Sequence, residues 1–76
     1  MKTDDEIYAK ISEYGTPRVV VQALQWARLR INHDPDEAEV LIRARIAKLT
    51  LVARTTKPAR AAQINALKWV IDEGEI

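Results

Sequence analysis

The residues best suited to binding chemistry lie in a basic segment, Val40–Lys68, that contains seven Lys or Arg and no acidic residue. Part of it surrounds a predicted turn between two helices. Hydroxyls, free amides at a helix start and nearby cationic side chains bind phosphates and carboxylates well. We therefore expect either a solvated basic face that acidic residues elsewhere in the fold compensate, which is the usual role of such charges, or an anion site or a surface for an acidic partner. The candidate residues are Arg43, Arg45, Lys48, Arg54, Thr56, Lys57 and Arg60.

Catalytic and metal chemistry are not expected from this sequence. It has no Cys, a single His and no glycine-rich phosphate loop. His33 stands near Asp34, Asp36 and Glu37, but a helix start accounts for these acids without a metal ion. We expect neither an enzyme nor a cofactor, because no second base or nucleophile accompanies the histidine.

The elements that must position these residues fit within 76 residues, which is at most one domain. The 12 Lys and Arg nearly balance the 11 Asp and Glu, so the whole chain has no strong electrostatic pull towards nucleic acid or membranes. Without Cys there is no disulfide framework. The acidic start of the chain is unlike a signal peptide, and no segment is apolar enough to span a membrane, so we expect a cytoplasmic protein.

Start and stop signals divide the chain into four predicted helices. Thr3-Asp4-Asp5-Glu6 is a capping box, in which the threonine and glutamate side chains accept from each other's backbone amides. Thr16-Pro17 and Asp34-Pro35 each offer an N-cap before a proline that the first turn tolerates. Gly15 and Gly74 are the expected stops. The helices should span about 4–13, 17–32, 35–53 and 57–73, which predicts an all-α bundle with antiparallel neighbours.

Apolar residues at helical spacing predict which face of each helix is buried. The first three helices each show a clear stripe, and the fourth has a wider one. The predicted core residues are Ile7, Ile11 and Tyr14; Val20, Leu24, Ala27 and Ile31; Ala38, Ile42, Ile46, Leu49 and Ala53; and Ile64, Leu67 and Ile71, flanked by Ala62, Ala66, Trp69 and Val70.

The third predicted helix also carries a second apolar stripe, opposite its core stripe, formed by Val40, Ala44, Ala47 and Leu51. A helix that is apolar on two sides must be buried on two sides. Either the fourth helix covers this stripe or another chain does. Arg43 and Arg54 are predicted to flank it on one side, and Arg45 and Lys48 on the other. Because a core this small supplies little stability, we expect a homo-oligomer, with a two-fold dimer favoured.

A DNA-binding alternative rests on the first two predicted helices and the short turn between them, which outline a helix-turn-helix. Arg18 and Gln22 would then read guanine and adenine. The match is poor, because Lys10 and Ile11 occupy positions where an apolar and a small residue are expected, and because the first helix is acidic.

These observations favour a small non-enzymatic regulator or inhibitor that docks on a partner macromolecule, in the manner of small accessory proteins of phages and mobile elements. The first alternative is a binder of a phosphorylated or nucleotide ligand at the basic turn, residues 54–60. The second is the DNA-binding protein that uses Arg18 and Gln22.

Overall fold

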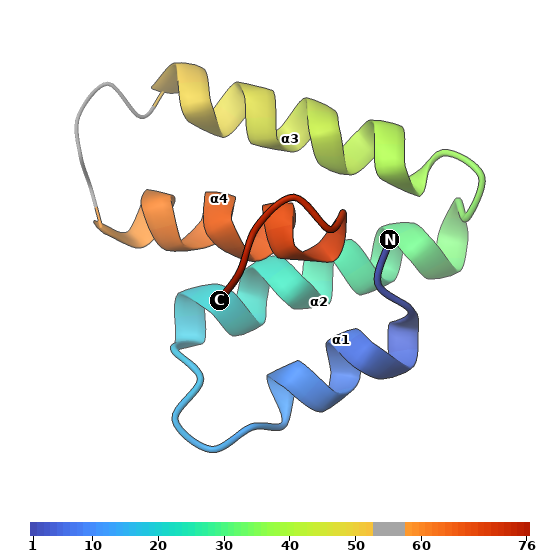
Figure 1. Ribbon diagram of the computed structural model, residues 1–76. Helices are drawn as coiled ribbons and strands as arrows, with labels where there is room; N and C mark the ends of the chain where they lie inside the picture. Colours follow the sequence, from blue (N-terminus) through green and yellow to red (C-terminus); the bar gives the residue numbers. More distant parts are fainter. Residues whose placement is uncertain (53–57) are drawn as a thin grey trace.

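The computed structural model describes residues 1–52 and 58–76, and within them the chain is all-α, with no strand. Its helices are α1 (Asp4–Ile11), α2 (Arg18–His33), α3 (Ala38–Val52) and α4 (Pro58–Val70). The chain reverses direction between successive helices (Figure 1). Helix α2 packs against α1, α3 and α4, and α3 also packs against α4. Helix α2 is thus the element around which the other three are arranged.

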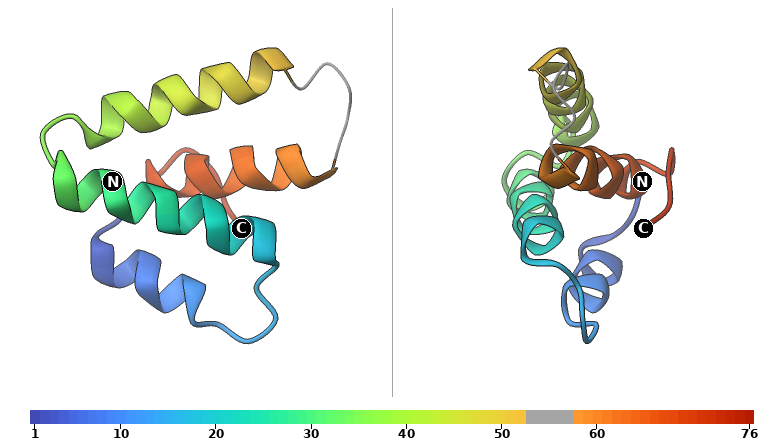
Figure 2. Two further views of the ribbon diagram at one scale, coloured as in Figure 1. Left: turned by 180° about the vertical axis from the view of Figure 1, so that it is seen from behind. Right: turned by 90° about the vertical axis from the view of Figure 1, so that its left-hand side faces the viewer.

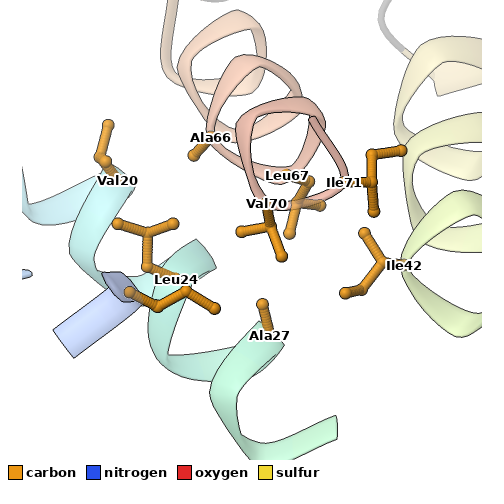
Figure 3. Packing of buried hydrophobic residues seen from close by; sticks show 9 residues of the cluster. Val20, Leu24, Ala27, Ile42, Ala66, Leu67, Val70 and Ile71 are labelled. Carbon is orange, nitrogen blue, oxygen red and sulfur yellow. The ribbon is translucent and has the colours of Figure 1, made fainter. Parts of the chain in front are cut away.

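The core forms mainly between α2, α3 and α4, and α1 contributes the fully buried side chain of Ile7. In Figure 3, Ile42 of α3 points towards Val70 of α4 and towards Ile71, which follows that helix, while Leu24 and Ala27 approach from α2. The predicted stripes of α2, α3 and α4 therefore supply most of the core. Two predicted core residues differ: Ile64 is only half-buried, and the side chain of Tyr14 is fully exposed because α1 ends before reaching it.

The start of α1 agrees with the prediction, and its end does not. The Thr3 hydroxyl accepts from the Glu6 amide at 3.2 Å, and the Glu6 carboxylate accepts from the Thr3 amide at 3.3 Å. The helix stops at Ile11, and just beyond it the Thr16 hydroxyl donates to the carbonyls of Lys10 and Glu13. Thr16 therefore satisfies the end of α1 instead of capping α2, which begins after Pro17 without a side-chain cap.

The start of α3 also corrects a prediction. Asp34 ends α2 with φ −135° and ψ +64°, outside the α-helical region, which is disfavoured for a residue that precedes proline. Residues 35–37 form a turn, in which the Glu37 amide donates to the Asp34 carbonyl at 3.0 Å. Helix α3 consequently begins at Ala38, three residues later than the proline signal suggested. The expected end at Ala53 lies outside the described residues, as does the expected start of α4 at Lys57.

Helix α4 ends at Val70, and Asp72, not Gly74, turns the chain. Asp72 has a φ of +62°, and the amides of Asp72 and Glu73 donate to the carbonyls of Trp69 and Lys68. This is the Schellman arrangement, in which Asp is one of the few residues that tolerate a left-handed backbone. The Asp72 carboxylate pairs with the Lys2 ammonium, and its other oxygen with the amine of Met1 at 2.7 Å.

This ion pair closes the two ends of the described chain on each other. The Lys2 amide donates to the Val70 carbonyl at 2.7 Å, and the Lys2 ammonium lies 5.2 Å from the centre of the Trp69 ring. The hydrogen bond from Lys2 lowers the pKa of the Asp72 carboxyl from 3.8 to about 2, and the N-terminal amine adds to this effect. A second tie joins α1 to α2, where Arg28 donates to Asp4 at 2.8 Å and lowers the pKa of that carboxyl.

We predict that the Asp72 pair stabilises the fold above about pH 4 and is lost as the pH falls towards 2. The sign follows from the lowered pKa, because an unfolded Asp72 binds its proton at a higher pH than the folded one. Asp72→Asn keeps a residue that tolerates positive φ but removes the charge. It should lower the urea midpoint at pH 7 and have little effect at pH 2, whereas the control Glu75→Gln changes neither. Equal losses at both pH values would contradict this account.

Candidate interaction surface on the third helix

Helix α3 has one buried side and one exposed apolar side. Ala38 and Ile42 are fully buried against the other helices, and Ile46 and Leu49 are half-buried on the same side. Val40 and Leu51 point the other way, with 67% and 77% of their surface exposed. Helix α3 lies at the edge of the molecule, and no other described helix covers its far side (Figures 1 and 2).

The second apolar stripe predicted from the sequence is therefore open in this chain. We call Val40, Ala44, Ala47 and Leu51 the outer stripe; all four are exposed. The alternative in which α4 covers it does not hold for the described residues, because α4 packs on the Ile42 side of α3. An exposed apolar face of this kind on a small protein is typical of an interaction site.

Arg43 lies on the rim of the outer stripe and is already paired within the chain. Its guanidinium donates to Glu73 at 2.7 Å and to Glu39 at 3.1 Å. The hydrogen bond that Arg43 donates to Glu73, followed by the one that it donates to Glu39, raises the pKa of Arg43 above its ordinary value. Arg43 was predicted to be a ligand for an anion or an acidic partner, but the structure shows it holding the end of the chain onto α3.

Arg45 does not flank the outer stripe, which corrects the sequence prediction. Its guanidinium carbon lies 5.5 Å from the centre of the Trp26 ring, over the ring face, on the side of α3 that faces α2. The reason is rotational: Arg45 follows Ala38 by seven residues and Ile42 by three, which places it beside the core stripe. A cation over an indole face is attracted by the ring quadrupole.

The other predicted anion-binding residues are not brought together in the described structure. Lys48 is exposed on α3 and flanks the outer stripe, as predicted. Arg60 is half-buried on α4, where it interacts with another part of the chain. Arg54, Thr56 and Lys57 lie outside the described residues. The anion site predicted at the basic turn therefore remains a prediction.

Arg18 and Gln22, the proposed base readers, are both exposed on α2. However, six residues separate α1 from α2, whereas a helix-turn-helix uses a turn of three or four. Helix α2 is also flanked by three helices instead of projecting from the surface. Gln22 lines a hollow between α2, α3 and α4. This geometry gives the DNA-binding alternative no support.

Three further observations on the described residues bear on function. The described residues contain no cluster of three His, Asp or Glu side chains that could hold a metal ion, and His33 is exposed. Tyr14, predicted to be buried, lies beside a wide groove of about 560 Å³ that Pro17, Val20 and Ile76 also line. None of the described helices combines the length and hydropathy required of a membrane span.

Comparisons with known proteins leave these surfaces as the basis for a functional argument. No protein-family model matches the chain, and searches of curated proteins and of solved structures found no significant similarity.

Substitutions on the two sides of α3 should differ strongly in their effect on the free energy of unfolding. Ile42→Ala removes a fully buried side chain and should cost about 2–5 kcal/mol of unfolding free energy. Leu51→Ala, on the exposed side, should change the stability of the dilute protein by less than about 0.5 kcal/mol. Urea denaturation at low protein concentration measures both. A large loss for Leu51→Ala under these conditions would place Leu51 in the core of the single chain.

Proposed function

We propose that the protein is a non-enzymatic binding protein that works as a homodimer, with the outer stripe of α3 docked on a second copy. The observation that carries this proposal is the exposure of Val40 and Leu51 on the far side of a helix whose other side is already packed. Covering these side chains removes apolar surface from water, which favours association. The dimer is then the unit that docks on a partner macromolecule as a regulator or inhibitor.

The spacing of the outer stripe supports a second copy as its occupant. Val40 and Leu51 lie at equal distances along the sequence from the midpoint between Arg45 and Ile46, and so do Ala44 and Ala47. If two α3 helices cross antiparallel about a two-fold axis at that midpoint, each Val40 faces the Leu51 of the other copy. The two alanines then face each other at the centre. A two-fold interface requires this kind of self-complementary surface.

The sizes of the side chains fit the same arrangement. Helices pack about 8–10 Å apart, and small residues at the crossing point allow the closer end of that range. Ala44 and Ala47 occupy the centre of the outer stripe, and the larger Val40 and Leu51 occupy its ends. In the antiparallel pair, Leu51 of one copy therefore packs beside the smaller Val40 of the other. The centre consists of alanines, so no polar side chain is buried there.

Charge on the rim limits how tightly two copies associate. The positive charge of Arg43 is offset by Glu39 and Glu73, whereas Lys48 has no ion pair with a described residue. Two Lys48 side chains approach along the same edge of an antiparallel pair, and salt screens their repulsion. A single helix from each copy buries less than the roughly 1,600 Å² of a standard interface. We therefore propose a weak dimer that is strengthened, not weakened, by salt.

We predict that sedimentation velocity shows a monomer–dimer equilibrium whose dimer fraction rises with protein concentration and modestly with salt. Leu51→Glu puts two acidic groups into the interface and should leave only monomer, with an unchanged far-UV circular dichroism spectrum. The matched control is Leu29→Glu, since Leu29 is 51% exposed on α2 and lies outside the outer stripe.

Three results would overturn the proposal. The first is a wild-type chain that stays monomeric at all concentrations that remain soluble. The second is equal disruption of the dimer by Leu29→Glu, which would place the contact elsewhere. The third is unfolding of the Leu51→Glu chain, which would assign Leu51 to the core of the single chain. The milder variant Leu51→Ala checks this result: if it stays folded and dimerises as well as the wild type, the contact does not depend on Leu51.

A further inference from the structure

A hollow of about 170 Å³ lies where α2, α3 and α4 meet, on the opposite side of α3 from the outer stripe. Its polar lining consists of Gln22, Arg45 and Gln63, one residue from each helix, and its apolar lining includes Trp26, Leu49 and Leu67. We refer to it as the Trp26 hollow. No acidic residue lines it, although the chain as a whole has 11.

Arg45 differs from the paired arginines around it. Arg28 donates to Asp4, and Arg43 donates to Glu39 and Glu73. Arg45 makes no ion pair with a described residue, and its guanidinium lies over the face of Trp26. A ring face attracts the cation but accepts none of its in-plane N–H groups as a carboxylate does. The guanidinium thus remains able to donate to an acceptor that enters the hollow.

The two glutamines add neutral donors to this cation. Each carboxamide carries two N–H groups, and neither Gln22 nor Gln63 forms a side-chain hydrogen bond with another described residue. Both line the same hollow as Arg45. The guanidinium of Arg45 and the two carboxamides can all donate hydrogen bonds into the hollow, and no acidic side chain in its lining competes for them. This set of donors matches the acceptor oxygens of a carboxylate.

The size of the hollow further limits which ligands can fit. Pockets for drug-sized ligands and cofactors typically measure about 300–1,000 Å³, so a hollow this small does not enclose a nucleotide. It is large enough for the end of one acidic side chain or for a small free acid. We infer that the Trp26 hollow binds a carboxylate, with Arg45 as the charged donor, the two glutamines as neutral donors and Trp26 as the apolar wall.

This inference goes beyond the proposed dimer and does not require it, because the hollow belongs to a single chain. In a dimer formed through the outer stripe, both hollows stay open, since they lie on the inward sides of the two α3 helices. The basic segment, which has no acid from residue 40 to residue 68, also attracts acidic ligands to this part of the surface.

The test is an NMR titration of the full-length chain with a capped hexapeptide of glutamate, a capped hexapeptide of glutamine, and sodium acetate. The indole N–H signal of Trp26 reports on the hollow, and that of Trp69 serves as the internal reference. We expect a saturable shift of the Trp26 signal with the glutamate peptide and none with the glutamine peptide. If acetate also saturates the shift, the ligand is a small free acid; if only the peptide does, it is an acidic segment of a protein.

Matched variants distinguish specific binding in the hollow from non-specific electrostatic attraction of the acidic peptide to the basic helix. Arg45→Gln should weaken binding about tenfold or more, since it removes a charged donor. Lys48→Gln removes the same charge from the same helix and should change affinity less than about twofold. Gln63→Leu keeps the size of the side chain, so it should weaken binding without affecting the fold even if Arg45→Gln proves unstable. The monomeric Leu51→Glu chain should bind as the wild type does, which separates this inference from the dimer.

The inference is overturned if the Trp26 signal does not shift saturably with either carboxylate probe. It is also overturned if the glutamine peptide binds equally well, or if Arg45→Gln and Lys48→Gln weaken binding to the same degree.

Discussion

The one-sided attachment of α3 is the constraint on which the functional surfaces of this protein depend. Ala38 and Ile42 are fully buried against the other helices, and this contact fixes the rotation of α3 about its axis. Once that rotation is set, Arg45 must lie over Trp26, and Val40 and Leu51 must face outward. The Trp26 hollow and the outer stripe are therefore two consequences of the same packing, on two sides of one helix.

The small size of the chain explains why so much apolar surface remains outside. Within the described residues, the four short helices enclose only a few large buried side chains, and below about 70–80 residues one core rarely supplies more than about 3–5 kcal/mol. Ion pairs supplement the core at its edges, where Asp72 joins the ends of the chain and Arg43 holds Glu73. A second copy on the outer stripe would extend the core across α3, which otherwise has only one packed side.

Much of the fold follows from local signals in the sequence. Which partner a particular side chain contacts does not follow from them. The capping box at Thr3 and the apolar stripe that contains Leu24 were predictable, because each depends on spacing along one helix. Thr16 and Asp34 were misassigned, because each can serve the helix before it or the helix after it. The outer stripe was predicted, but the Trp26 hollow was not, since Gln63 is brought to Arg45 only by the packing of α4.

Disulfide trapping tests the central claim, the antiparallel docking of two outer stripes, most directly, because the chain contains no cysteine of its own. Val40→Cys and Leu51→Cys chains are mixed and oxidised, with Leu29→Cys as the exposed control. The account predicts that the mixed Val40→Cys and Leu51→Cys pair cross-links faster than either variant does alone, since facing Cα atoms must lie within about 7 Å. Cross-linking no faster than that of the Leu29→Cys control, or faster between identical variants, would contradict the antiparallel dimer.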